Sequence, residues 1–225
     1  MTERFSRQAS IIPPEAISRH RFCVVGVGAV GRQVAMQLAG AGAKYVRVID
    51  FDKVEPVNIA TQHYQADFIG RTKVEAVVQE MKRLNLEGDA DFVEDCQMWR
   101  PREVAKWGPT VLFSCVDNME ARQSIYHYFK KYKVPLLLDG RMLGENIHFL
   151  TVEQGDTHYE GTLFSDAEAE QGRCTAQSTY FASSCLASLM IRNLSMFLRK
   201  FPIDEKDRKL NLLDLDSGFM KPRKK

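Results

Sequence analysis

Short apolar runs alternate along the chain with longer segments in which apolar residues recur every three or four positions. The short runs are rich in β-branched residues, which favour strands. In the longer segments the apolar side chains share one face of a helix. Residues 72–85 illustrate this second pattern, with Val74, Val77, Val78, Met81 and Leu84 on one face. Alternation of strands and amphipathic helices is typical of a parallel α/β sheet.

The pattern predicts a Rossmann-like α/β fold, with a mostly parallel central sheet, helices on both faces and antiparallel strands toward the C-terminus. We expect one domain over residues 1–225, with its nucleotide-binding part at about 20–140. The predicted strands cover residues 21–26, 45–50, 91–94, 110–115 and 135–139, and the helices 28–41, 72–85 and 118–132. Past Gly140 the pattern changes, and we expect a strand at 146–152, a polar crossover loop at about 153–174, a long helix at 175–200 and a strand at 210–215.

Composition narrows the class of protein. The 225 residues are 44% hydrophobic and carry a formal net charge of only +2, so no overall field points to a nucleic-acid partner. No apolar run approaches the roughly 20 residues of a membrane helix, and the charged N-terminus has no signal-peptide core. The five cysteines include no Cys-x-x-Cys pair, which argues against a disulfide framework and a structural zinc site. We expect a cytoplasmic protein without a membrane or nucleic-acid partner.

A glycine motif marks the junction of the first predicted strand and helix. Gly26, Gly28 and Gly31 form a Gly-x-Gly-x-x-Gly pattern, which allows a tight turn and lets backbone amides approach a phosphate. The acid expected about 20 residues later, to bind a ribose hydroxyl, is Asp50. A glycine turn that serves only packing would not need this acid. The motif predicts nucleotide binding and leaves NAD and ATP both open.

Further motifs follow in order and carry a family resemblance. They are Asp-x-Asp at 50–52, Asn-x-x-x-Gln at 58–62, Gly-x-x-Lys-x-Glu at 70–75 and Asp-Asn-x-x-x-Arg at 117–122. Together with the glycine motif they resemble the ThiF/MoeB/HesA family, relatives of the ubiquitin-activating enzymes. Residues 4–8, Arg-Phe-Ser-Arg-Gln, are similar to that family's N-terminal motif. The resemblance covers residues 4–192.

The resemblance implies an ATP- and Mg²⁺-dependent adenylation site. Asp50 would bind the ATP ribose, Asn58 and Lys73 the phosphates, and Asp117 the Mg²⁺, with Asn118 beside it. Arg7 would reach across a homodimer interface into the partner's site. The remaining implied nucleotide-site residues belong to the same motifs: Gly26, Gly28, Ala29, Gly31, Asp52 and Gln62. Such a set is chemically sufficient, because cations, a metal and glycine amides must offset negative charge as pyrophosphate leaves.

Each residue also has a plainer interpretation. Lys73 opens a helix and would be solvated in many proteins, while Asp117 and Asn118 precede a helix and could cap it. One position departs from the family, since Thr61 stands where relatives carry an arginine that contacts the triphosphate. Either another cation such as Arg71 substitutes for it, or adenylation is weaker.

Cys174 is the candidate nucleophile. It ends the predicted crossover loop and is followed by Thr175, a pair that resembles the version in ubiquitin-activating enzymes. A helix starting directly after it, and the neighbouring Arg173, would lower the pKa of the thiol. Cys23, Cys115 and Cys185 fall inside predicted strands or a helix, which favours structural roles. Some relatives form only the acyl adenylate and no thioester, so the resemblance leaves the role of Cys174 open.

The leading hypothesis is ATP-dependent adenylation of the C-terminal carboxylate of a ubiquitin-like or sulfur-carrier protein, with thioester formation on Cys174 as a further step. A second hypothesis is activation of a small or RNA-linked carboxylate. An NAD-dependent oxidoreductase would leave the Asn58, Lys73 and Asp117 pattern unexplained. A nucleotide-binding scaffold without catalysis remains open because of Thr61.

Overall fold

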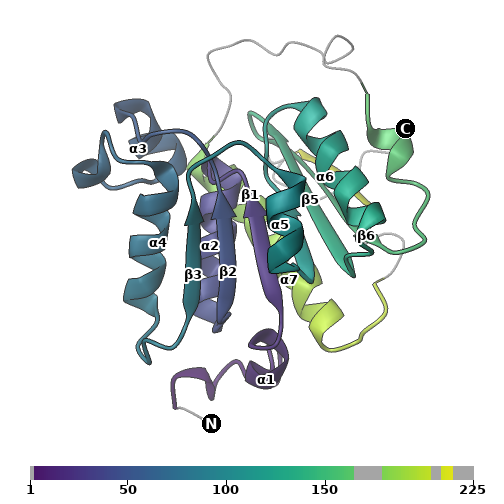
Figure 1. The fold of residues 1–225 in the computed structure, drawn as a ribbon, viewed down its shortest axis with the longest axis horizontal. Helices are drawn as coiled ribbons and strands as arrows, with labels where there is room; N and C mark the ends of the chain where they lie inside the picture. Colours follow the sequence, from purple (N-terminus) through teal and green to yellow (C-terminus); the bar gives the residue numbers. More distant parts are fainter. Residues whose placement is uncertain (1–2, 165–178, 204–208, 215–225) are drawn as a thin grey trace.

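The computed structural model describes residues 3–164, 179–203 and 209–214, and the following statements concern those residues. Its strands form a single sheet in the order β3-β2-β1-β4-β5-β6-β7 (Figure 1). The strands are β1 (Arg21–Val25), β2 (Tyr45–Ile49), β3 (Asp91–Asp95), β4 (Val111–Ser114), β5 (Leu136–Leu143), β6 (Asn146–Glu153) and β7 (Lys209–Asp214). The α-helices are α1 (Pro14–Ile17), α2 (Ala29–Ala41), α3 (Pro56–Gln62), α4 (Lys73–Leu84), α5 (Pro101–Trp107), α6 (Met119–Lys131) and α7 (Tyr180–Leu198). Short 3₁₀ turns cover Glu3–Phe5, Ala66–Phe68 and Glu160–Thr162.

The sheet topology confirms the predicted fold class. Strands β1 to β5 run parallel, whereas β6 pairs antiparallel with β5 and β7 antiparallel with β6. The strand order changes direction between β1 and β4, since β2 lies on one side of β1 and β4 on the other. Ligands of open α/β sheets bind outside the carboxyl ends of the strands at such a switch point.

Helices cover both faces of the sheet and divide the core in two (Figure 1). Helices α2, α4 and α7 pack on one face, where Phe22 and Val24 of β1 point. Helices α5 and α6 pack on the other face, against Cys23 and Val25. This alternation along β1 is what a strand buried on both sides requires.

Several element boundaries differ from the sequence prediction. The helices α3 and α5 were not predicted, and each is a seven-residue helix with a proline in its first turn. Such short helices offer too few apolar positions for a periodic signal. Strand β5 continues to Leu143 rather than residue 139, because it turns through Gly144 (φ 61°) directly into β6.

Helix α7 begins later than predicted, and it is long enough to be compared with a membrane helix. Thr179 has extended backbone, so the helix begins at Tyr180 instead of residue 175. By length and composition alone its 19 residues would suit a membrane span, although the sequence contains no uninterrupted apolar run of about 20 residues. More than half of it is buried against the rest of the fold, and a buried core helix meets the same criteria.

Candidate functional site

The three glycines of the loop between β1 and α2 have different surroundings. A side chain at Gly26 (φ +82°) would place its Cβ 2.6 Å from the carbonyl oxygen of Cys115, and one at Gly31 would place it 1.8 Å from the carbonyl oxygen of Gly26. Gly28 instead faces open space, with only the Gln62 side chain at 4.0 Å. Gly26 and Gly31 therefore permit close packing, while Gly28 leaves the approach to the α2 N-terminus free.

The N-terminus of α2 fits an anionic group. Gly28 is its N-cap, and no side chain caps the first turn, which starts at Ala29. The first N–H groups of a helix lack partners within the helix and carry a partial positive charge. This arrangement is the usual cradle for a nucleotide phosphate.

Asp50 lies at the carboxyl end of β2, beside this loop. Its Oδ2 accepts a hydrogen bond from the backbone N–H of Val27 (2.8 Å), and its Oδ1 accepts one from that of Asp52 (2.8 Å). Burial raises the pKa of Asp50, against the opposing effect of these two donors. The carboxylate is thus fixed to the glycine loop and still partly exposed, which suits a group that binds a ribose hydroxyl.

Lys73, the first residue of α4, points into the same region. Its side chain is only 7% exposed, and its Nζ forms an ion pair of 2.8 Å with Oδ2 of the half-exposed Asp52. The buried Tyr64 hydroxyl donates to the carbonyl oxygen of Val27 at 2.7 Å, which ties the segment before α4 to the glycine loop. Tyr64 was not a sequence candidate, because a lone tyrosine in a polar stretch gives no signal. The structure brings Asp50, Asp52 and Lys73 together.

Helix α3 carries three motif positions with different roles. Asn58 is buried, and its Oδ1 accepts from the backbone N–H of Glu55 at 2.9 Å in a capping box. Gln62 lies against Gly28, and its buried Oε1 has no hydrogen-bond partner among the described residues. The Thr61 hydroxyl donates to the carbonyl oxygen of Val57 at 2.9 Å, a bond internal to the helix. Of these three α3 side chains, Gln62 is therefore the one with an unused hydrogen-bond acceptor, its Oε1, beside the glycine loop.

Arg71 does not take the place of the missing family arginine in this structure. Its exposed guanidinium lies 3.6 Å from Glu75 and over the ring of Phe68. Glu75 is exposed, whereas Phe68 is buried under the guanidinium, so both contacts hold Arg71 at the segment that leads into α4. Lys73 is thus the sequence-predicted phosphate contact whose cation is held beside Asp50.

Asp117 and Asn118 follow β4, the strand next to β1. Asn118 caps α6, since its Oδ1 accepts from the backbone N–H of Ala121 at 2.8 Å. Its Nδ2 donates to Oδ1 of Asp117 at 3.3 Å. Asp117 is exposed, and the loop before it meets the glycine loop where Gly26 packs on the Cys115 carbonyl. An exposed carboxylate at this edge fits a Mg²⁺ ligand.

A buried ion cluster next to this loop was missed by sequence reasoning. Asp139 on β5 is fully buried and binds Arg122, while its Oδ2 accepts from Nε of Arg141 (2.7 Å) and from the Tyr159 hydroxyl (3.0 Å). Arg122 also donates to the carbonyl oxygen of Val116, directly before Asp117. Burial alone would raise the pKa of Asp139, but the two arginines outweigh it and hold this pKa below its ordinary value.

The N-terminal candidate lies at the other end of the sheet. Gln8 donates to the carbonyl oxygen of Ala41 at the end of α2 (2.9 Å), and Phe5 packs against Gly42. The glycine loop lies at the start of α2, so the exposed Arg7 is one helix length away from the nucleotide site of its own chain (Figure 1). Only a neighbouring copy could bring it there, and its role stays a prediction.

The cysteines separate by exposure. Cys23 is buried in β1, and burial raises its pKa; burial also raises the pKa of Cys115 and Cys185. Cys96, which follows β3, is exposed. Cys174 lies outside the described residues. Because α7 begins six positions beyond it, at Tyr180, the expected help from a helix starting at residue 175 is not supported.

No group of three or more metal-ligating side chains occurs within residues 3–164 and 179–203. The absence of a structural zinc in the whole chain therefore stays a prediction. A Mg²⁺ bound with a nucleotide takes most of its ligands from phosphate and water, so a single carboxylate such as Asp117 is compatible with it.

Comparisons with known proteins agree with this geometry. Residues 5–225 match the ThiF family. The tRNA threonylcarbamoyladenosine dehydratase of Escherichia coli is 27% identical over 150 residues, which are 64% of this chain and 55% of that protein. The molybdopterin-synthase adenylyltransferase of Salmonella typhimurium is 30% identical over 129 residues, 55% of this chain and 50% of that protein. The chain thus spans about half the length of these relatives.

A solved structure confirms the fold. That of E. coli MccB with AMPCPP and MccA superposes with a TM-score of 0.71 over 89% of this chain and 65% of that one, at 15% identity. At such low identity the match concerns the architecture, a mostly parallel sheet covered by helices.

Proposed function

Because the chain belongs to the ThiF family, we propose that it adenylates the C-terminal carboxylate of a ubiquitin-like or sulfur-carrier protein, using ATP and Mg²⁺. The observation that carries this proposal is the joint placement of Asp50, Lys73 and the open side of Gly28 at one end of the sheet. A relative that is an adenylyltransferase by name supports it.

In the proposed reaction a carboxylate oxygen of the carrier attacks the α-phosphorus of ATP. The bond from that phosphorus to the β-phosphate oxygen breaks, and pyrophosphate leaves with the electron pair. The α2 N-terminus and Lys73 offset the negative charge of the phosphates, and Asp50 holds the ribose. Asp117 would hold Mg²⁺, which supplies further positive charge to the leaving pyrophosphate. Asp52, paired with Lys73 here, would release it to the phosphates.

A calorimetric titration separates this proposal from the NAD and scaffold alternatives. Mg·ATP should bind the wild type, and Lys73→Ala should weaken it about tenfold or more, since one charge-assisted contact is lost. Lys82→Ala, an exposed lysine at the far end of the same helix, is the matched control. Binding of NAD without ATP would overturn the proposal.

Catalysis itself is measured by exchange of labelled pyrophosphate into ATP. Exchange that appears only when a candidate carrier protein is added, and disappears with Asp117→Asn, supports adenylation. ATP binding without exchange for any ubiquitin-like or sulfur-carrier protein would favour a nucleotide-binding scaffold.

We further propose that Cys174 attacks the acyl adenylate, so that a thioester forms and AMP leaves. A mixture of protein, Mg·ATP and carrier should then give an adduct that thiols cleave and that Cys174→Ala abolishes. Cys96→Ala is the control, because Cys96 is the exposed cysteine among the described residues. An adduct that survives Cys174→Ala refutes this step.

A second candidate substrate, an RNA-linked carboxylate, is favoured by one finding. The E. coli relative is named for a modified tRNA nucleoside. Pyrophosphate exchange stimulated by RNA rather than by a carrier protein would select this candidate. Whether the protein works as a homodimer, with Arg7 acting across the interface, is tested by sedimentation and by mixing Arg7→Ala with Lys73→Ala protein to restore activity.

A further inference from the structure

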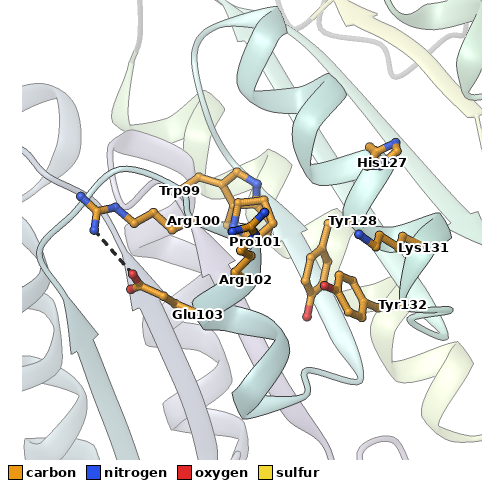
Figure 2. A pocket seen from close by; sticks show the side chains of 9 residues that line it. All are labelled: Trp99, Arg100, Pro101, Arg102, Glu103, His127, Tyr128, Lys131 and Tyr132. Carbon is orange, nitrogen blue, oxygen red and sulfur yellow. Dashed lines mark hydrogen bonds and ion pairs between the residues drawn. The ribbon is translucent and has the colours of Figure 1, made fainter.

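A cavity of about 420 Å³ opens between α5 and α6, away from the nucleotide site (Figure 2). Its walls are the start of α5 with the residues before it and the last turns of α6. These helices cover the face of the sheet opposite α2 and α4. None of the glycine-loop residues and no member of the Asp139 cluster lines the cavity, so it is separate from both.

Positive charge dominates the lining. Arg102 lies on the α5 side and Lys131 on the α6 side, and the His127 ring also lines the cavity from α6 (Figure 2). Neither Arg102 nor Lys131 has an ion-pair partner within the described residues, and Nζ of Lys131 lies 5.6 Å from the centre of the Tyr132 ring. The single acidic lining residue, Glu103, already accepts from Nε2 of Gln97 at 2.8 Å. Two cations thus remain available to an anion.

Aromatic rings frame the same cavity and are held in place. Trp99 meets Tyr128 edge to face, with ring centres 5.3 Å apart, and its Nε1 donates to the Ser124 hydroxyl at 3.2 Å. Tyr128 in turn packs on Tyr132 at 4.6 Å. Tyr128 is buried, whereas Tyr132 is 42% exposed. The inner rings fix the position of Tyr132, which keeps a large part of its surface for a ligand.

Fixed aromatic surface beside unneutralised cations is the combination that binds a base and its phosphate, because every nucleobase stacks on a ring and every nucleotide carries a phosphate. We propose that the α5–α6 cavity is a second binding site that takes one nucleotide unit, either a free nucleotide or part of a single RNA strand. The base packs on Tyr132, and the phosphate lies between Arg102 and Lys131. The net charge of +2 gives no sign of this site, because a net charge does not show where on the surface the positive side chains cluster.

The test measures fluorescence anisotropy of a labelled eight-residue adenylate RNA with the full chain at low salt. We expect binding that weakens with salt, and at least a tenfold loss in Arg102→Glu and in Lys131→Glu. The control Arg83→Glu reverses an exposed arginine on α4, across the sheet, and should change affinity less than twofold. Tyr132→Leu should weaken binding about fivefold, while Tyr132→Phe, which keeps the ring, should not.

Competition identifies the source of the nucleotide unit. Displacement of the RNA by equimolar AMP indicates a free nucleotide as ligand, and displacement only by longer strands indicates RNA. Absence of binding, or equal loss in Arg83→Glu, overturns the proposal. So does displacement by an eight-residue glutamate peptide as effective as the RNA, because the surface would then recognise negative charge alone. Mg·ATP binding at the glycine loop is measured in the same variants and stays unchanged, which separates this proposal from the adenylation site.

Discussion

Two aspartates at strands β2 and β5, which are separated in the sheet by β1 and β4, differ in how many of their oxygens remain free for a ligand. Asp50 follows β2 and is held by two backbone N–H groups, with part of its surface open to ligands. Asp139 on β5 is fully buried and bound by two arginines and a tyrosine. Their pKa values shift in opposite directions, up for Asp50 and down for Asp139.

The difference shows how to separate a binding carboxylate from a structural one. Arginine charges stabilise the ionised Asp139 and use its oxygens, so no ligand can reach it. Asp50 is oriented by neutral donors and keeps capacity for another hydrogen bond. The fully bonded, buried Asp139 and Arg122 fix the loop before Asp117, whereas Asp50 is only partly buried and has no direct ion pair among the described residues, which leaves it able to bind a ligand.

The largest effect should come from Asp139→Asn. This change leaves the buried Arg122 and the largely buried Arg141 without a counter-charge, and we expect a loss of about 3–5 kcal/mol in unfolding free energy. Urea unfolding measures it. The matched variant Asp50→Asn should cost about 1 kcal/mol or less, because at most one backbone hydrogen bond is lost. Equal losses in both variants would contradict the comparison.

Asp50→Asn should instead weaken nucleotide binding. Removing a charged acceptor for the ribose should raise the Kd for Mg·ATP about 10- to 100-fold. Calorimetry at neutral pH measures this Kd. GTP carries the same ribose, so its affinity should fall by a similar factor in Asp50→Asn. Unchanged affinity for Mg·ATP would remove Asp50 from the site.

Lowering the pH should change the contributions of the two carboxylates to the free energy of unfolding in opposite directions. The lowered pKa of Asp139 contributes stability that is present above its ordinary pKa of about 3.9 and is lost as the pH falls through the folded-state pKa. The raised pKa of Asp50 costs stability at neutral pH, and this cost is relieved as the pH falls toward 3.9. Each group changes the slope by at most about 1.4 kcal/mol per pH unit.

Unfolding free energies between pH 3 and pH 6 test these signs. Asp139→Asn should flatten the loss of stability at the acid end, and Asp50→Asn should steepen it. Curves that run parallel to the wild type in both variants would show that neither pKa shift is linked to folding.

The smallest effect should come from Thr61→Arg. It supplies, on α3, the cation that the family resemblance predicts at this position, near the Lys73 cation of the described site. We expect Mg·ATP to bind about two- to fivefold more tightly, because a partly exposed ion pair contributes under about 1 kcal/mol. Thr61→Gln, which is long and neutral, controls for side-chain length. Equal tightening by both would exclude a charge effect.

The sequence by itself determined the sheet, the glycine loop and Asp50, because each depends on short-range signals. Hydrophobic alternation, a six-residue motif and one acid at fixed spacing are all local. The predicted start of α7 was wrong, since the mostly polar residues 175–179 contain no signal that marks where the backbone becomes helical. Sequence reasoning also missed α3 and α5, which are too short to show a period.

Only the tertiary structure decided how the remaining polar groups are used. Arg122 and Tyr159 meet Asp139 from positions 17 and 20 residues away, on different elements, and no spacing rule predicts such a meeting. The same holds for Arg102 and Lys131, which line one cavity because α5 and α6 pack on the same face of the sheet. A side chain's chemistry depends on burial and on its partners, and both arise from packing between distant parts of the chain.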